Sequence, residues 1–198
     1  ELNRDQNDCK LVSYNAETGD RIAELYHETD AKYVEPQHPI MFLPWDNSKF
    51  ILQSQKDGYN HLYLFNKDGK QLKQLTSGPW VVENVVGFNN EKHTVIILSN
   101  ECNPIQRNIF SVNVDTGKRA HIDEDGEGWH SAQLSSSGKY LVDSYSAPEI
   151  PRNIAIVNTE NAKCTRYFTA ENPWKGYAVP EYKSGTCLLY TSDAADER

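Results

Sequence analysis

Residues 61–69 read His61-Leu-Tyr-Leu-Phe-Asn-Lys-Asp-Gly69, a strand-forming run that ends in an Asn/Asp/Gly turn. The same phrase recurs as Leu11-Val-Ser-Tyr-Asn-Ala-Glu-Thr-Gly19, Asn108-Ile-Phe-Ser-Val-Asn-Val-Asp-Thr-Gly117 and Asn153-Ile-Ala-Ile-Val-Asn-Thr-Glu-Asn-Ala162. The four turns end 50, 48 and 45 residues apart, at positions 19, 69, 117 and 162. A period of this length is typical of the four-stranded blade of a β-propeller.

Two further phrases recur in register with the first. A polar turn launches an apolar strand at residues 46–54, 90–99 and 136–144, and Gly-Pro-Trp80 and Gly-Trp129 open two of the repeats. Apolar recurrence at helical spacing is absent, so helix should be scarce. The sequence therefore predicts an all-β propeller fragment of about three and a half four-stranded blades. The expected half blade covers residues 8–27, and the full blades cover 36–77, 79–123 and 128–169.

Composition excludes several classes of protein. The net charge of the 198 residues is -8 and no basic stripe is present, so the chain lacks the footprint of a nucleic-acid-binding protein. Mean hydropathy is -0.70 and no apolar run approaches the roughly 20 residues that span a bilayer. The four cysteines are widely separated and predict neither a disulfide framework nor a zinc site.

The two ends of the sequence resemble cut ends. The chain begins at Glu1 without a methionine. Its last residues, 187–198, read CLLYTSDAADER and resemble the translation of a sequencing adapter. We therefore expect residues 1–186 to be an internal slice of a longer protein, and we leave 187–198 out of the fold prediction as non-native.

Catalytic motifs are missing from the sequence. There is no Gly-x-Ser-x-Gly, no phosphate-binding Gly-rich loop and no His-Glu-x-x-His, so no catalytic residue is predicted in this chain. The acidic run at residues 123–127 lacks the alternating ligand spacing of a calcium loop, which favours a solvated loop. The six histidines are scattered, so the sequence predicts no metal site and no cofactor.

The segment Tyr33-Val-Glu-Pro-Gln-His-Pro39 has no copy in the other repeats. Non-repeated loops are where a propeller tends to carry its binding groups. We therefore assign Tyr33, Val34 and Glu35 as candidate substrate-facing residues, with Glu35 as a holder of a cation or amine. The other interpretation, an ordinary loop carboxylate, remains open. Trp80 and Trp129 stand at equivalent blade openings, which favours packing between blades over a stacking platform.

The order of several phrases along the chain resembles a known family. Tyr33-Val-Glu-Pro36, Asp57-Gly-Tyr-Asn-His-Leu-Tyr63, Gln74-Leu-Thr-Ser-Gly-Pro-Trp-Val81, Pro104-Ile-Gln-Arg107 and Glu171-Asn-Pro-Trp-Lys175 occur in this order. In this order they are similar to the last blades of the N-terminal propeller of dipeptidyl peptidase IV-type prolyl peptidases, particularly those of Bacteroidetes. Each phrase alone is weakly specific, whereas their order and spacing together are fairly specific.

The resemblance implies an exported serine-type dipeptidyl peptidase, in the periplasm or at the cell surface, which releases N-terminal X-Pro or X-Ala dipeptides. In that family a propeller of about eight blades covers a C-terminal α/β-hydrolase domain. The implied partners are peptides with Pro or Ala second, the hydrolase domain and a second copy of the chain. Residues 1–169 would be the last propeller blades and 170–186 the linker toward the hydrolase domain. The catalytic serine, aspartate and histidine, and the paired glutamates that hold the substrate amine, would lie outside this chain, whose blades would gate access.

Two alternatives stay open at the level of sequence. A non-catalytic periplasmic propeller that acts as a protein-binding scaffold would show the same repeats, and only the linker-like 170–186 argues against it. Another member of the prolyl oligopeptidase group, with tripeptidyl or acylaminoacyl specificity, would share both the fold and the chemistry.

Overall fold

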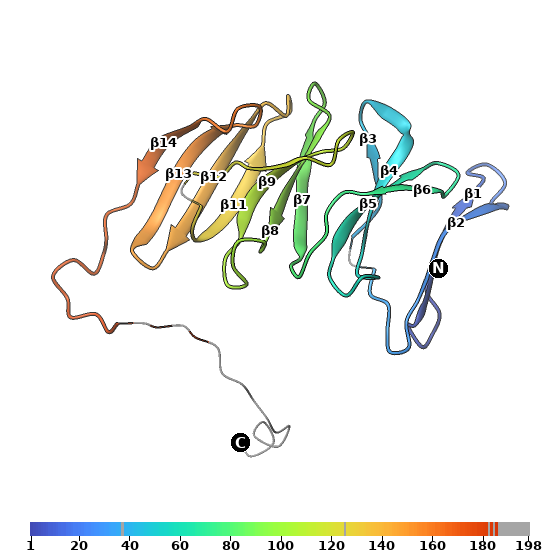
Figure 1. Ribbon diagram of the computed structural model, residues 1–198, viewed down its shortest axis with the longest axis horizontal. Coiled ribbons are helices and arrows are strands. Elements are labelled where there is room, and N and C mark those ends of the chain that lie inside the picture. Colours follow the sequence, from blue (N-terminus) through green and yellow to red (C-terminus); the bar gives the residue numbers. More distant parts are fainter. Residues whose placement is uncertain (37, 125, 182, 184, 186–198) are drawn as a thin grey trace, which may run out of the picture.

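The computed structural model describes residues 1–36, 38–124, 126–181, 183 and 185. The described residues contain fourteen β-strands and no helix (Figure 1). The strands are β1 (Asp8–Tyr14), β2 (Arg21–Thr29), β3 (Met41–Leu43), β4 (Asp46–Ser54), β5 (His61–Asn66), β6 (Gln71–Gln74), β7 (Val82–Asn89), β8 (Thr94–Ser99), β9 (Asn108–Asn113), β10 (Arg119–His121), β11 (Trp129–Leu134), β12 (Tyr140–Ala147), β13 (Ile150–Asn158) and β14 (Cys164–Thr169).

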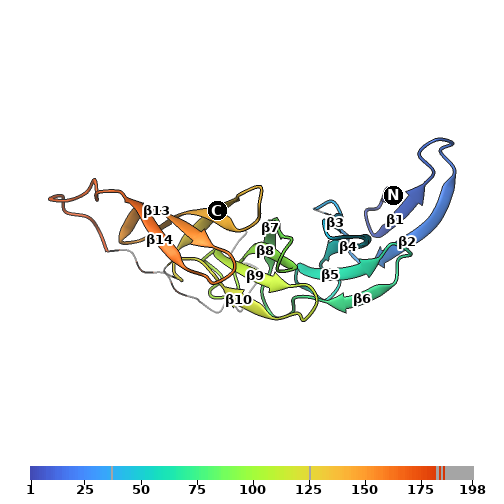
Figure 2. The same cartoon turned by 90° about the horizontal axis from the view of Figure 1, so that it is seen from above.

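The strands form four sheets in which neighbours along the chain pair antiparallel. Three sheets have four strands, in the orders β3-β4-β5-β6, β7-β8-β9-β10 and β11-β12-β13-β14, and β1 pairs with β2 alone. The sheets stand side by side in a curved row, with β3 and β7 on its concave side and β6 and β10 on its convex side (Figure 2). Successive four-stranded meanders arranged in this way are propeller blades.

The hydrophobic cores lie between the sheets. Strand β8 shows why: Val95 and Ile97 belong to one core, shared with the β3–β6 sheet, while Ile96 and Leu98 belong to another, shared with the β11–β14 sheet. Because successive side chains of a strand point to opposite faces, a strand between two neighbouring sheets must be apolar at every position. This burial on both faces accounts for the unbroken Val-Ile-Ile-Leu run.

The repeated phrase places an asparagine at the start of each tight turn. Asn15 and Asn113 illustrate the arrangement: each side-chain oxygen accepts backbone N–H bonds from the turn, and each backbone carbonyl accepts one from the glycine that closes it. Gly19 and Gly117 have φ values of 78° and 77°, in the left-handed region. Ala162 adopts the same conformation with φ 57° and bears the steric cost that glycine avoids.

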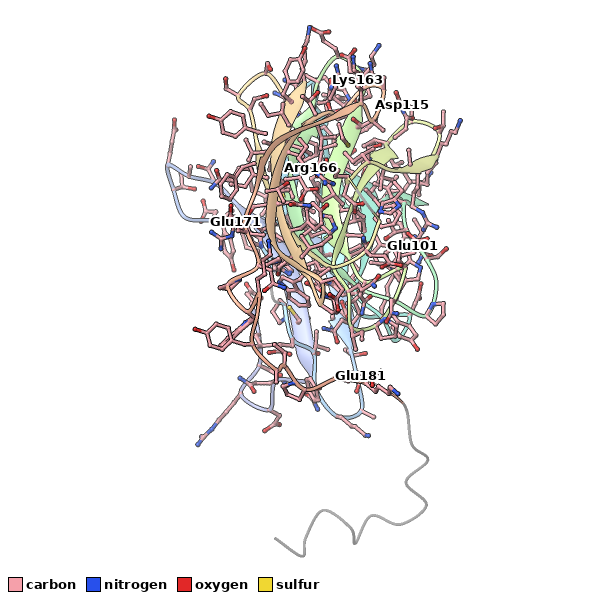
Figure 3. All side chains as sticks on the ribbon, turned by 90° about the vertical axis from the view of Figure 1, so that its left-hand side faces the viewer. Glu101, Asp115, Lys163, Arg166, Glu171 and Glu181 are labelled. Carbon is pink, nitrogen blue, oxygen red and sulfur yellow. The ribbon has the colours of Figure 1, made fainter. Side chains whose placement is uncertain are left out.

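The strands of all the sheets end at two opposite faces of the molecule. One of them, here called the link face, carries the links between sheets (30–40, 75–81 and 122–128) and the loops 55–60, 100–107 and 148–149. The opposite face, called the turn face, carries the tight turns that join the first to the second strand and the third to the fourth strand of each four-stranded sheet, and β1 to β2. Figure 3 shows Asp115 and Lys163 in two of these turns at one end, and Glu181 at the other.

The predicted fold class is confirmed, since the described residues are all-β and form three four-stranded blades preceded by a two-stranded sheet. The four sheets fall close to the residue ranges expected for the blades, with β2 running two residues past the expected half blade. No helix able to cross a membrane occurs in the part of the chain that the structure describes. The expected adapter-derived residues 187–198 lie outside the described residues.

Candidate functional site

The link that joins β2 to β3 is longer than the other two. It spans 11 residues, 30–40, whereas 75–81 and 122–128 span seven each. Two backbone bonds hold it against the N-terminal loop: Val34 N donates to Gln6 O at 2.7 Å and Asp30 N donates to Asn7 O at 3.1 Å. The Val34 side chain is buried, with 7% of its surface exposed. The link is therefore anchored at its centre, while its neighbouring side chains stay accessible.

A cavity of about 880 Å³ lies beside this link, between the β1–β2 sheet and the β3–β6 sheet. Its volume falls within the range of small-molecule sites. The apolar part of its wall comes from both sheets and from the link, and includes Leu11, Tyr26, Val34, Ile40 and Leu52.

The three predicted site residues all line this cavity. The exposed fraction of Tyr33 is 61%, Glu35 is exposed, and Val34 between them is buried. The link therefore presents a phenol and a carboxylate at the cavity while its valine fastens it to the fold. Their role toward substrate remains a prediction.

The strongest polar feature of the cavity is the carboxylate of Glu28, which sequence reasoning missed. Its Oε2 atom accepts hydrogen bonds from the Tyr26 hydroxyl and the Ser54 hydroxyl, both at 2.7 Å. The two hydroxyl oxygens are 3.1 Å apart, so the three side chains form a closed triangle. Burial raises the pKa of Tyr26, so its hydroxyl remains a donor at neutral pH.

Lys56 occupies the neighbouring part of the wall. Its Nζ lies 4.1 Å from the centre of the Tyr63 ring and 5.6 Å from that of Tyr26, and it donates to Gln71 Oε1. A cation over aromatic faces is stabilised by the ring quadrupole. The Lys56 ammonium is thus held by rings and an amide rather than by Glu28.

No motif in the sequence marks Glu28, Ser54 or Lys56 as site residues. Tyr26 and Glu28 are two apart on β2 and so share a face, which the alternation of a strand predicts. Ser54 comes from another sheet, 26 residues away, and meets Glu28 only because the two sheets pack together.

Both tryptophans at the blade openings contact a neighbouring blade, as predicted, but to different extents. Trp80 is 7% exposed, belongs to the core between two sheets and meets His61 edge-on at 4.8 Å. Trp129 lies under the Arg107 guanidinium of the preceding blade at 4.5 Å, which is a cation–π contact at the surface, and its side chain is 49% exposed.

The prediction that residues 123–127 form a solvated acidic loop is wrong for Asp123. This side chain is 9% exposed and accepts hydrogen bonds from Asn108 Nδ2, the Ile109 and Gly126 backbone N–H groups and His121 Nε2. Burial raises the pKa of Asp123, but the hydrogen bonds outweigh it and the net pKa is lowered. The carboxylate stays ionised and ties a link to the start of β9.

His61 has a structural role at the start of β5. It is 1% exposed, its Nδ1 lies 3.1 Å from the Thr76 hydroxyl, and its Nε2 lies 2.9 Å from the Gly78 carbonyl oxygen. Asn108 stands at the start of β9 and makes the equivalent attachment through Asp123. In both blades a buried polar side chain at the start of the third strand holds the link that follows the fourth.

Comparison with known proteins agrees with this geometry. The sequence profile described as "Dipeptidyl peptidase IV (DPP IV) N-terminal region" matches residues 1–152, well over half of the chain. The chain belongs to the dipeptidyl peptidase IV family. Within the family, it matches part of the crystal structure of a "putative dipeptidyl aminopeptidase IV" from Bacteroides ovatus with a TM-score of 0.85 and 44% identity, over 94% of this chain and 29% of that one.

Two more distant relatives of the family show the same match. The crystal structure of Porphyromonas gingivalis dipeptidyl peptidase 4 gives a TM-score of 0.74 at 26% identity, over 86% of this chain and 23% of that one. The Aspergillus oryzae protein named "Probable dipeptidyl-aminopeptidase B" is 30% identical over 183 residues, which are 87% of this chain. The chain spans 20% of the length of that relative.

Proposed function

We propose that this chain is the propeller portion of an exported, serine-type dipeptidyl peptidase that releases N-terminal X-Pro or X-Ala dipeptides. The observation that carries the proposal is the match of residues 1–152 to the N-terminal region of the dipeptidyl peptidase IV family. The catalytic groups would come from a C-terminal α/β-hydrolase domain of the same protein. Residues 170–186 would lead to that domain. The enzyme would work in the periplasm or at the cell surface.

The link face supports this arrangement. Large apolar side chains are exposed there on a link, on two loops and at the start of β11, namely Tyr33 at 61%, Tyr59 at 41%, Ile105 at 64% and Trp129 at 49%. Exposed apolar groups gathered on one end of a molecule mark a surface that another body covers. A hydrolase domain seated on this face would enclose the cavity beside the 30–40 link, and peptides would reach it past the blades. The blades would then gate access by size.

The proposed activity can be tested with a hydrolysis assay of the whole protein. Expressed with all of its downstream sequence, it should hydrolyse glycyl-prolyl and alanyl-prolyl chromogenic substrates and lose this activity on treatment with a serine-directed organophosphonate. Absence of hydrolysis, together with a downstream sequence that encodes no Gly-x-Ser-x-Gly, would instead identify a protein-binding propeller.

The predicted substrate contact of Glu35 can be tested by mutation. In the whole enzyme, Glu35→Ala should raise KM for proline dipeptide substrates by about three- to tenfold while kcat changes little, because it removes a binding contact rather than a reacting group. Glu17→Ala is the matched control, since Glu17 is an exposed carboxylate in a tight turn of the opposite face. Unchanged kinetics in Glu35→Ala would remove Glu35 from the site.

A further inference from the structure

One peptide group of the link between β10 and β11 faces a buried histidine. The Glu127 carbonyl oxygen lies 3.0 Å from His130 Nε2, and the other ring nitrogen, Nδ1, lies 2.9 Å from both carboxylate oxygens of Asp143. The side chains of His130 and Asp143 are both 0% exposed, so bulk water does not contact the ring. An imidazolium donates from both nitrogens and satisfies both contacts, whereas a neutral imidazole has one donor and one acceptor.

Deprotonation of this ring affects its two contacts unequally. The proton that remains is held at Nδ1 by the Asp143 carboxylate, because a charged acceptor makes the stronger hydrogen bond. Nε2 then presents a lone pair to the Glu127 carbonyl oxygen, and two acceptors 3.0 Å apart repel each other. The neutral state of His130 therefore favours a different orientation of the Glu127 carbonyl group.

The charged groups around His130 determine the pH at which the ring changes state. Burial disfavours the imidazolium, but the hydrogen bond and the charge of Asp143, aided by the charge of Asp123, outweigh it and raise the pKa of His130 above 6.5. The imidazolium is therefore complete below about pH 6.5 and is lost as the pH rises through the raised pKa. The other charged or titratable groups of the elements packed here have partners of their own, namely Asp123 with His121, Glu124 with Arg166, the Tyr145 hydroxyl with Arg166, and Arg107 with the His130 backbone carbonyl.

The Glu127 carbonyl group stands between two glycines whose neighbouring peptide groups are held in place. Gly126 and Gly128 have φ values of 72° and 109°, in the region that glycine adopts more readily than other residues. The Gly126 carbonyl oxygen accepts from Asn108 Nδ2 at 3.1 Å, and the Gly128 carbonyl oxygen accepts from Arg107 N at 3.0 Å. The peptide groups on either side are thus fixed, while the group between Glu127 and Gly128 can turn.

We propose that His130 and the Glu127–Gly128 peptide group form a pH-sensitive switch in the link face. At low pH the Glu127 carbonyl oxygen accepts from the imidazolium, and at high pH the peptide group turns away from the neutral ring. Trp129 follows directly and is 49% exposed on the link face, so the shape of this surface changes with pH. The inference goes beyond the proposed function and does not depend on it.

Fluorine NMR of the whole protein labelled with 5-fluorotryptophan tests the switch. The Trp129 resonance is assigned by its absence in Trp129→Phe. Between about pH 5.5 and about pH 9 this resonance should shift in one step, with its midpoint above pH 6.5. A Trp129 resonance that keeps its position over this range would overturn the proposal.

Two variants separate a turned peptide group from a change of charge. The side-chain amide of His130→Gln reaches the position of Nε2 and donates to the Glu127 carbonyl oxygen at every pH, so Trp129 should keep its low-pH resonance. The shorter amide of His130→Asn reaches only the position of Nδ1 and offers Glu127 no donor, so Trp129 should keep its high-pH resonance. Equal resonances in the two variants would show an effect of charge alone and would refute the switch.

Crystal structures of the wild-type whole protein at both ends of this pH range give the answer if a variant does not fold. The distance from His130 Nε2 to the Glu127 carbonyl oxygen should remain near 3.0 Å at low pH and exceed about 3.5 Å at high pH. The same orientation of this carbonyl group in both structures would contradict the proposal.

Discussion

At the scale of single residues, His130 is the most constrained ionisable group in the described chain. Its side chain is fully buried, Nδ1 lies 2.9 Å from both Asp143 oxygens and Nε2 lies 3.0 Å from the Glu127 carbonyl oxygen. Both ring nitrogens thus face acceptors, and only an imidazolium can donate from both. Burial lowers the pKa of His130, but the hydrogen bond and charge of Asp143, aided by Asp123, outweigh it and raise the net pKa.

This geometry predicts a pH dependence. Because the folded pKa of His130 lies above 6.5, the stabilisation is complete below about pH 6.5 and is lost as the pH rises through the raised pKa. The loss amounts to about 1.4 kcal/mol for each unit by which the folded pKa exceeds the unfolded one. Hydrogen exchange of β11 and β12 in the whole protein, corrected for intrinsic rates, should show this loss of protection.

The variant His130→Gln should remove the pH step and lower protection at pH 6. The matched control is His93→Gln, because His93 pairs with Asp115 at the surface, where both side chains are more than 40% exposed and ion pairs contribute little. A pH step that survives in His130→Gln would assign it to another group.

At the scale of elements, a tight turn of one blade also packs against the neighbouring blade. The turn between β11 and β12 inserts Gly138 against the end of β7: a Cβ placed on Gly138 would lie 2.3 Å from the Phe88 carbonyl oxygen. The Thr159 hydroxyl donates to the Gly138 carbonyl oxygen at 2.7 Å and accepts from Asn89 Nδ2 at 3.0 Å, so three elements meet there. Gly138 is needed both for its φ of 72° and for this close approach.

Gly138→Ala should therefore destabilise the whole protein by about 3 kcal/mol, since left-handed strain and a backbone clash add together. Gly19→Ala measures the left-handed strain without the backbone clash. Gly19 has a similar φ of 78° but no atom within 4 Å of the added Cβ, so a loss of about 1 kcal/mol is expected. Chemical denaturation of both variants measures the difference, and equal losses would show that the inter-blade contact is unimportant.

At the scale of the whole molecule, the row of sheets is open at both ends. On the outer face of the β11–β14 sheet, Val142 pairs with Ile156 and Ile154 pairs with Phe168, and Val142, Ile156 and Phe168 are 40%, 43% and 46% exposed. Figure 3 views the molecule from this end, with Arg166 on β14 in the foreground. In a propeller such a face packs against the next blade.

Residues 1–186 expressed alone should therefore self-associate. Val142→Lys combined with Ile156→Lys places charges at the centre of the exposed face and should shift the chain toward monomer in sedimentation velocity. The control pair Ser131→Lys and Gln133→Lys adds the same charge on β11 without removing apolar surface. A monomeric, cooperatively melting wild-type chain would contradict the prediction.

The sequence by itself determined the blades, because their signals are local. An Asn/Asp/Gly turn and an apolar strand are encoded within about ten residues each, and their spacing counts the sheets. The same locality explains why the non-repeated segment at Tyr33 could be singled out and does line a cavity.

Only the tertiary structure decided which side chains meet across sheets. Glu28 meets Ser54, His130 is enclosed with Asp143, Asp123 is buried and Trp129 is exposed because of how one sheet is seated on the next. That seating depends on the summed packing of many side chains in the cores between sheets, and no short segment encodes it. For this reason the family and fold could be read from the sequence, whereas the side-chain contacts between sheets could not.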